Sequence, residues 1–408
     1  MDYPKLRCVN AFPIEHEGQN LICLQDPTGF CQEVLFVPHS VFALMTFFDG
    51  RHSVRDIQAE YMRRYGELVY KENLLELITT LDGHLLLESE RFAAYRKQLE
   101  DEFKGLERRP AALAGKSYEA DPRSLERQLQ GFFTSPEGPG SQMGNRPSET
   151  LKGLIAPHID LRYGGPCFAW AYQELRADLE ADVFIIFGTA HNETKGFFAL
   201  TSKDFETPLG VVETDKAFLR ELEKRYPYDL YQDELNHKTE HSVEFQVVFL
   251  QYLYRNRKPI KILPILCGSL HELIVTGVDP LTVPPVRDFI QALRAILSSK
   301  SYKVCMIAGA DLSHIGPRYG DPQPPSRSLL RQIAEEDLST LKQVEQLSLK
   351  GFFRSIQKDH NRRRICGVAP IYALLATLDA SRGKLLKYDQ SLDPVTRSMV
   401  SFASMAFY

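Results

Sequence analysis

The stretch VFIIFGTAHNET, residues 183–194, begins with five apolar residues, passes through small residues, and ends in a polar run that starts at His191. A short run of β-branched and aromatic residues followed by glycine predicts a buried strand of a covered sheet. His191 then lies at the carboxyl end of that strand, where open α/β sheets have their ligand crevice. The stretch therefore predicts an α/β fold with a polar group at its functional edge.

Two further stretches repeat this pattern. GLIAPHID (153–160) places His158 after a short apolar run, and KVCMIAGADLSH (303–314) places Asp311 and His314 after another. If the three strands are parallel neighbours, their carboxyl ends meet at one edge of the sheet, so these side chains and His191 converge. A single histidine is more often structural, but three such strand ends favour a shared site in which His158 and His191 offer neutral nitrogens to a divalent metal.

The composition is typical of a soluble globular protein. The 408 residues suffice for two or three domains, with 43% hydrophobic and 25% charged residues. A formal net charge of −4 gives no electrostatic reason to expect nucleic acid or an anionic membrane surface as a partner. Because no apolar run approaches a membrane span and the start lacks a signal-peptide core, we expect a cytoplasmic protein. The seven cysteines include no CxxC pair, which argues against a disulfide framework or a zinc ribbon.

A turn-rich segment at 134–150 separates two differently patterned regions. Before it we expect short strands within 21–37, a helix over 52–66, a second helix over 71–89 that closes at Asp82-Gly83 into a strand, and a charged helical connector at 98–110. Helix, helix and strand in this order predict a winged helix, and residues 1–105 are assigned to this small α+β domain. Basic residues are not concentrated on its second helix, so DNA binding is only weakly supported.

Strands and helices alternate after residue 150. Strands are expected at 152–157, 181–187, 197–202, 260–267 and 303–308, and helices near 167–177, 215–225, 240–255, 285–298, 328–343 and 368–379. The runs KLLKYDQS and MVSFASMAFY look like a terminal antiparallel pair. Residues 106–408 are therefore expected to form an α/β three-layer domain with a mostly parallel central sheet.

Two pairs of polar residues are candidates for proton transfer. TEHSVEFQ places His241 and Glu244 on one helical face, which is typical of a ligand pair or of a general acid/base with its orienting partner. A surface pair that serves the helix dipole explains this spacing equally well. In ADLSH, Asp311 is placed to orient His314 as a general acid/base, or alternatively to cap the following turn.

Cys366, in RRICGVAPI, follows a basic run and precedes a predicted helix. Both neighbours favour the thiolate, which suits a soft metal ligand or a redox-sensitive cysteine. On spacing alone, a buried structural thiol remains the better interpretation.

Six motifs, in the order GLIAPHIDLRYGG, IIFGTAHN, TEHSVEFQ, ILPILCGS, ADLSHIG and ICGVAPI, resemble the Memo family, known in bacteria and archaea as AmmeMemoRadiSam system protein B. The resemblance implies a fold similar to the class III, LigB-type extradiol dioxygenases, which are non-haem iron enzymes. It also implies that Cys366 takes the place of the carboxylate that completes the two-histidine facial triad of those dioxygenases. The implied metal ligands are His158, His191 and Cys366, with Asp311, His314 and His241 around the same pocket.

The amino-terminal region has a second resemblance. FFDGRHSVRDIQAEYMRRYG followed by LLELITTLDGHLLLES is similar to the PqqD-like winged helix. That resemblance implies a peptide partner, which such domains bind as an added edge strand. The alternative is a domain that covers or dimerises the larger one.

These observations lead us to expect a non-haem iron(II) enzyme with a dioxygenase-type reaction on a small aromatic or electron-rich substrate. His314, oriented by Asp311, would be the general acid/base, and His241 with Glu244 would shape substrate protonation. One alternative is a non-catalytic iron or copper redox adaptor that works with a peptide or a radical-SAM partner. Another is a zinc hydrolase. No nucleic acid or membrane partner is expected.

Overall fold

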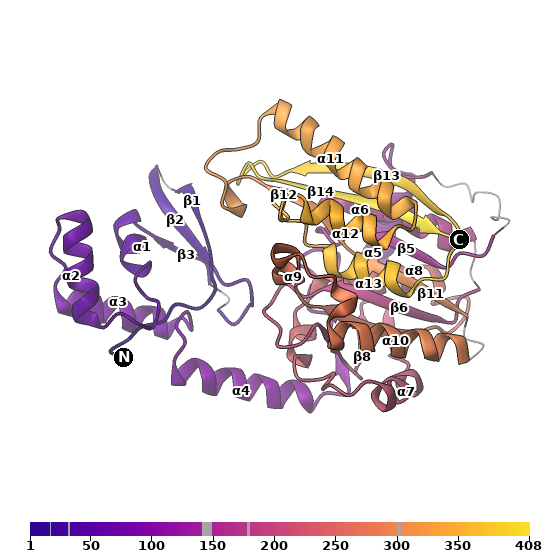
Figure 1. Ribbon diagram of the computed structural model, residues 1–408, viewed down its shortest axis with the longest axis horizontal. Helices are drawn as coiled ribbons and strands as arrows, with labels where there is room; N and C mark the ends of the chain where they lie inside the picture. Colours follow the sequence, from indigo (N-terminus) through magenta and orange to yellow (C-terminus); the bar gives the residue numbers. More distant parts are fainter. Residues whose placement is uncertain (17, 32, 141–148, 178–179, 300–302) are drawn as a thin grey trace. The chain divides into compact units, whose positions relative to one another are not determined.

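The computed structural model describes residues 1–16, 18–31, 33–140, 149–177, 180–299 and 303–408 (Figure 1). These residues form two compact units. The smaller comprises Met1–Gly105 with the short segments Gly316–Pro324 and Pro394–Arg397, and the larger comprises the remaining described residues. Most of the turn-rich segment predicted at 134–150 lies outside the described residues, since 141–148 are not among them.

The smaller unit is an α+β structure in which the sheet precedes the helices. Its antiparallel sheet has the strand order β1 (Asn10–His16), β2 (Gln19–Gln25) and β3 (Leu35–Val37). The helices α1 (His39–Met45), α2 (Val54–Tyr65), α3 (Lys71–Gly83) and α4 (Glu90–Lys104) follow. Helix α2 begins where the sequence predicted, because Ser53 and Asp56 form a capping box.

Two features of this region differ between the sequence-based prediction and the structure. The strand expected after Gly83 is reduced to one bridge, between Leu87 and Leu6, although Leu87 is fully buried in the unit's core. The α+β composition is thus confirmed, whereas the order of the elements is not that of helix, helix and strand. The connector predicted as helical over 98–110 leaves the helix at Lys104, and Arg108–Arg109 form the edge strand β4.

The larger unit is built on one mixed sheet. Its strand order is β12-β14-β5-β11-β6-β10-β9-β8-β4, with β13 beside β14 and β7 beside β10. Five neighbouring strands at the centre, β5, β11, β6, β10 and β9, are parallel, and both ends of the sheet contain antiparallel pairs. The mostly parallel central sheet predicted from the sequence is confirmed. The bounds are β5 (Gly153–Ala156), β6 (Val183–Thr189), β7 (Phe198–Leu200), β8 (Asp204–Thr207), β9 (Gly210–Thr214), β10 (Lys261–Cys267), β11 (Val304–Gly309), β12 (Asp311–Ile315), β13 (Gly383–Leu392) and β14 (Met399–Phe407).

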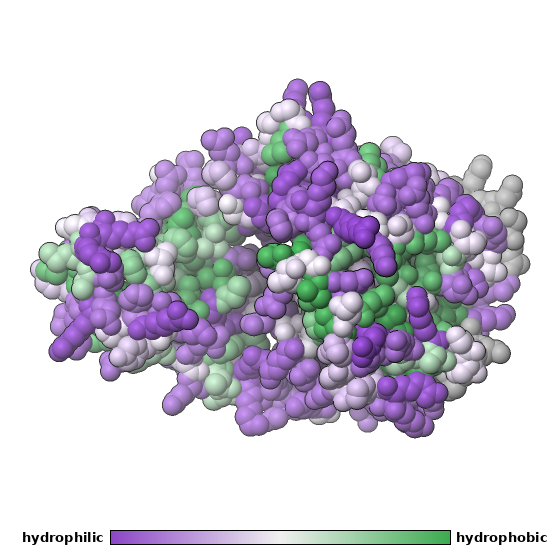
Figure 2. All heavy atoms as spheres, in the orientation of Figure 1, coloured by the Kyte–Doolittle hydropathy of each residue, from purple (hydrophilic) through white to green (hydrophobic). Residues whose placement is uncertain are grey.

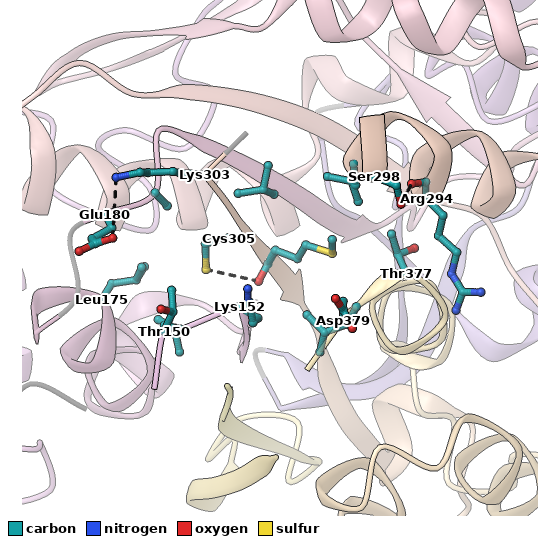
Figure 3. Close-up of a pocket in the computed structure, with 16 residues that line it drawn as sticks. Thr150, Lys152, Leu175, Glu180, Arg294, Ser298, Lys303, Cys305, Thr377 and Asp379 are labelled. Atoms are coloured by element: carbon teal, nitrogen blue, oxygen red, sulfur yellow. Dashed lines mark hydrogen bonds and ion pairs between the residues drawn. The ribbon is translucent and has the colours of Figure 1, made fainter. Parts of the chain in front are cut away.

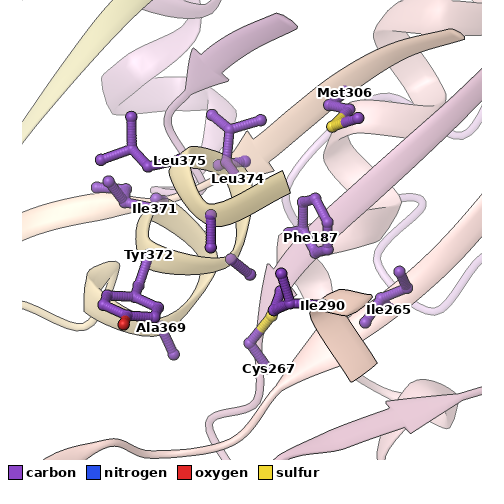
Figure 4. Packing of buried hydrophobic residues seen from close by; sticks show 14 of the residues in the cluster. Phe187, Ile265, Cys267, Ile290, Met306, Ala369, Ile371, Tyr372, Leu374 and Leu375 are labelled. Atoms are coloured by element: carbon purple, nitrogen blue, oxygen red, sulfur yellow. The ribbon is translucent and has the colours of Figure 1, made fainter. Parts of the chain in front are cut away.

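Helices cover both faces of this sheet, because alternate residues of its central strands point to opposite sides. Phe184 and Ile186 of β6 pack with α5 (Pro122–Thr134), α6 (Leu161–Ala177) and α8 (His241–Tyr254). The intervening Ile185 and Phe187 pack on the other side with α7 (Lys216–Arg225), α10 (Pro284–Ser299) and α13 (Val368–Thr377). Figure 4 shows Phe187 among side chains of β10, β11, α10 and α13. A three-layer domain results.

The remaining helices of the larger unit join the second of these layers or its loops. They are α9 (His271–Thr276), α11 (Arg327–Glu345) and α12 (Leu349–Gln357). There are also three short 3₁₀ turns, η1 (Glu234–Lys238), η2 (Pro280–Thr282) and η3 (Pro317–Tyr319). The last of these, η3, lies in a segment that belongs to the smaller unit. The strand predicted at 197–202 is the short β7, which pairs antiparallel with β10. The terminal antiparallel pair is confirmed as β13 and β14.

None of the helices in the described part of the chain is both long enough and apolar enough to span a membrane. In Figure 2 most of the visible surface is hydrophilic, and a hydrophobic area lies over the part of the larger unit where Figure 1 labels α10 and α13. On the face seen in Figure 2, polar residues therefore make up most of the surface outside this area.

Candidate metal centre

Three parallel strands bring the candidate site together at their carboxyl ends. The strand order β5-β11-β6 makes these strands neighbours, as the sequence predicted. His158 follows β5 by two residues, and His191 follows β6 by two. Asp311 begins β12 directly beyond β11.

Helix α8 adds a third histidine because its first turn packs tightly on the strand ends. A Cβ at Gly309 would lie 2.4 Å from the Ser242 carbonyl oxygen, and a Cβ at Gly188 would lie 2.6 Å from Ser242 Oγ. Only glycine permits this approach. His241, the first residue of α8, therefore lies beside the strand-end histidines.

The three imidazoles form one cluster. Ring centroids are 4.9 Å apart for His158 and His191, 5.2 Å for His158 and His241, and 4.6 Å for His191 and His241. One ligand atom of each lies within 4.8 Å of the others. The three imidazoles are therefore close enough that small side-chain movements would let them share a single metal ion.

The Nδ1 atom of each ring lies close to an oxygen acceptor. His158 Nδ1 lies 2.9 Å from the Gly309 carbonyl oxygen, so Nδ1 is the donor and Nε2 carries the free lone pair. His191 Nδ1 lies 3.0 Å from Glu240 Oε1, and His241 Nδ1 lies 3.2 Å from the same atom. Carbonyl or carboxylate acceptors behind Nδ1 are the usual outer partners of metal-binding histidines. The donor set therefore fits a metal bound through Nε2 atoms.

The charges of the site support metal binding as well. Burial lowers the pKa of His158 well below its usual range and lowers that of His241 to about 4, so both rings are neutral near pH 7. Burial acts in the same direction on His191, but the Glu240 carboxylate outweighs it and raises the pKa of this ring. Although burial disfavours the Glu240 anion, the two neighbouring imidazoles and its hydrogen bonds hold its pKa well below the usual range. A cation at the Nε2 side would take the place of the His191 proton.

Cys366 joins the cluster from a loop of unusual backbone conformation. Asn361 and Arg364 have φ values of 56° and 53°, and the Asn361 side chain accepts from the Ile365 backbone nitrogen at 2.9 Å. This loop places Cys366 Sγ 3.2 Å from His158 Nε2. Burial raises the pKa of the thiol, so a metal would have to displace its proton.

The predicted pair of Asp311 and His314 is not formed. Asp311 Oδ1 accepts from the backbone nitrogen of His158 at 2.9 Å, and its Oδ2 lies 3.6 Å from His158 Nε2. Burial raises the pKa of this carboxyl to about 7. His314 Nδ1 lies instead 2.9 Å from the Leu312 carbonyl oxygen. The reason is that the pairing of β5 with β11 brings the His158 backbone to Asp311, a long-range contact that spacing in the sequence does not reveal.

The predicted pair of His241 and Glu244 is not formed either. Glu244 is fully buried and accepts from Arg109, from the Leu113 backbone nitrogen at 2.9 Å and from the Tyr118 hydroxyl at 2.5 Å. The correct partner of His241 is Glu240, the residue that caps α8 through the backbone nitrogens of its first two residues. His241 and Glu244 do lie in the same turn of α8, as predicted. Glu244, however, is held by buried hydrogen-bond partners, as a structural group would be.

Sequence reasoning missed Glu240 and Arg109. The signal for Glu240 was an acidic residue directly before the predicted helix start at His241, a position at which carboxylates cap helices. Arg109 carried no signal, because its partners other than the adjacent Pro110 carbonyl, namely His237, Glu240 and Glu244, lie more than 120 residues away in the chain.

The cluster is open on one side. The side chain of His158 is 2% exposed, whereas those of His191 and His241 are each 33% exposed. A cavity of about 280 Å³ is lined by His191 and Cys366 together with Ile274, Ile365 and Val368. A second cavity, of about 470 Å³, shares His191 with it. Ligands therefore have a route to the Nε2 side of the cluster.

Another cavity, of about 530 Å³, lies at the amino ends of the same strands (Figure 3). It contains the cationic residues Lys152, Arg294 and Lys303 and the acidic residues Glu180 and Asp379. None of the histidines lines it. The candidate metal centre is thus confined to the carboxyl edge of the sheet.

Comparison with known proteins agrees with this architecture. Residues 109–406 match the family model described as Memo-like protein. A MEMO1 family protein of Aquifex aeolicus is 30% identical over 415 residues, which cover 99% of this chain and 100% of that protein. A MEMO1 family protein of Thermus thermophilus is 28% identical, with 88% of this chain and 99% of that protein covered, and one of Methanopyrus kandleri is 28% identical, with 71% and 93% covered. The chain therefore belongs to the Memo-like protein family.

Proposed function

We propose that this chain is a non-haem metalloprotein that binds iron(II) through His158, His191 and Cys366 and acts as an oxidoreductase of dioxygenase type on a small aromatic or electron-rich substrate. The observation that carries the proposal is the cluster of three imidazoles, each with its Nδ1 atom close to an oxygen acceptor, and a thiol 3.2 Å from His158 Nε2. Nitrogen and sulfur donors on one side of a site that is open on the other suit a redox-active transition metal.

When bound, the metal would supply redox chemistry toward oxygen and an electron-rich substrate. The side chains of the protein would hold the metal and position the substrate. His158 holds the buried side, and His191 and Cys366 face the cavity of about 280 Å³ in which a small ring fits beside Ile274, Ile365 and Val368. His241, neutral because burial lowers its pKa to about 4, presents a further nitrogen as a fourth ligand or as a hydrogen-bond acceptor for the substrate.

The first test is metal content by mass spectrometry on protein purified without oxygen. Wild type is compared with His158→Ala, His191→Ala and Cys366→Ser, and with His39→Ala as a control at an exposed histidine of the smaller unit. We expect about one iron per chain in wild type and in the control, and loss of iron in the other three. Metal content that is indifferent to these three changes would refute the proposed centre.

A metal-binding redox adaptor is the second candidate, and the Cys366 thiol favours it, because soft sulfur ligation suits copper(I) as well as iron. Oxygen consumption by the iron-loaded protein in the presence of substituted phenols separates the two. Turnover supports the oxidoreductase, whereas uptake limited to a single oxidation of the metal supports the adaptor.

A further inference from the structure

Arg109 holds the backbone on which Glu240 is mounted. Its side chain is fully buried, with Nε 2.8 Å from the His237 carbonyl oxygen and Nη2 2.9 Å from the Glu240 carbonyl oxygen. These two carbonyls flank the turn between η1 and α8. The planar guanidinium thus fixes the spacing of the two peptide groups that lead into the first turn of α8.

This turn carries the carboxylate that lies against both partly exposed imidazoles. The Glu240 carboxylate contacts Nδ1 of His191 and of His241 and also accepts from the His191 backbone nitrogen at 3.1 Å. Its side chain has few torsions between these contacts and the backbone that Arg109 holds. A displacement of the Glu240 main chain would therefore move both rings.

The charge of Arg109 is matched by Glu244, and both side chains are 0% exposed. A buried ion pair of this kind adds little net stability relative to apolar residues of similar volume. What it does provide is a guanidinium whose direction is fixed, since Glu244 is itself held by the Leu113 backbone nitrogen and the Tyr118 hydroxyl. Stability alone does not account for the pair.

We propose that Arg109 is a positioning residue of the metal centre, which sets metal affinity and geometry by holding Glu240 in place behind His191 and His241. The inference rests on the proposed metal centre. It assigns to the buried pair of Arg109 and Glu244 the support of the metal ligands rather than a part in proton transfer.

The test compares Arg109→Lys with Arg108→Lys in the full chain. Lysine keeps a positive charge for Glu244 but lacks the planar fork that reaches two carbonyls. Arg108 is the adjacent residue of the same strand, has a side chain that is 58% exposed, and pairs with Glu206 at 3.6 Å. It is therefore a matched control for the chemical change.

Cobalt(II) serves as the probe, titrated without oxygen into metal-free protein in competition with a chelating dye. We expect Arg109→Lys to weaken cobalt(II) binding by about tenfold, the lower end of the effect of changes behind metal-binding histidines, and to alter the visible spectrum of the bound ion. Arg108→Lys should match wild type in both. If Arg109→Lys lowers the melting temperature but leaves affinity and spectrum unchanged, Arg109 is only structural and the inference is wrong.

A double-mutant cycle tests whether Arg109 acts through Glu240. In the Glu240→Gln background, Arg109→Lys should change cobalt(II) affinity by less than about twofold, because residues that act as a unit are not additive. Full additivity would overturn the inference. Should Arg109→Lys fail to fold, Arg109→Gln combined with Glu244→Gln removes both charges together and gives the same comparison.

The failure of the metal centre itself would look different. Wild type would then bind no cobalt(II), or would bind it equally well after His191→Ala. Either result refutes the proposed function and this inference with it, whereas an unchanged Arg109→Lys refutes the inference alone.

Discussion

His237 makes the stability of the metal-free protein depend on pH in a calculable way. The residue is 1% exposed, its Nε2 lies 3.0 Å from the Ala199 carbonyl oxygen, and its Nδ1 has no hydrogen-bond partner among the described residues. Burial is the main cause that lowers its pKa from 6.5 to about 4, and the nearby Arg109 charge acts in the same direction. The folded state therefore holds this ring neutral where the unfolded chain already protonates it.

The sign and the size follow from that difference. Below pH 6.5 the unfolded state binds a proton that the folded state does not bind until about pH 4, so stability is complete above pH 6.5 and declines as the pH falls between these values. At 1.36 kcal/mol per pKa unit, the full loss is about 3 kcal/mol, of which about 2 kcal/mol is lost by about pH 5.

Urea unfolding of wild type and of His237→Gln at about pH 7.5 and about pH 5 measures this loss. Glutamine can still donate to the Ala199 carbonyl but does not titrate, and all other titrating groups are common to both proteins. We expect the free energy of unfolding of wild type to fall by about 2 kcal/mol more than that of the variant between the two pH values. Equal losses would refute the reasoning, and His39→Gln, at an exposed histidine, should behave as wild type.

Three further predictions concern the support of the site. Gly309→Ala should lower both cobalt(II) affinity and stability, the latter by about 1–3 kcal/mol in urea, since a Cβ there would lie 2.4 Å from a backbone oxygen of α8. The control Gly131→Ala, in a helix with open space, should not be destabilising, and equal effects would contradict the steric argument. Asp337→Asn should cost about 1.5–3 kcal/mol in the same assay, because it neutralises the nearest of three carboxylates around the buried Arg363 guanidinium, 2.6 Å from Nη1. Cys366→Ser should abolish the near-ultraviolet thiolate-to-cobalt absorption, and a band that persists would exclude Cys366 as a ligand.

The sequence by itself determined which segments become the central strands and which residues follow them. The short apolar runs that end in small residues at 153–156, 183–189 and 304–309 are local features of the sequence. The strands β5, β6 and β11 form there, within a few residues of the predicted bounds. His158 and His191 could be assigned to one edge because chain direction fixes which end of a parallel strand they follow.

Only the tertiary structure decided which partner each polar group takes. Spacing placed His241 and Glu244 on one helical face, but it does not specify what lies opposite, and the opposing group proved to be Arg109, 135 residues from Glu244 along the chain. Likewise Asp311 turns to His158, 153 residues away, rather than to the nearby His314. Local patterns encode secondary structure because they act over a few residues. The partners of buried polar groups depend instead on how distant segments pack, because each such group must bond with a donor or acceptor that the fold brings to it.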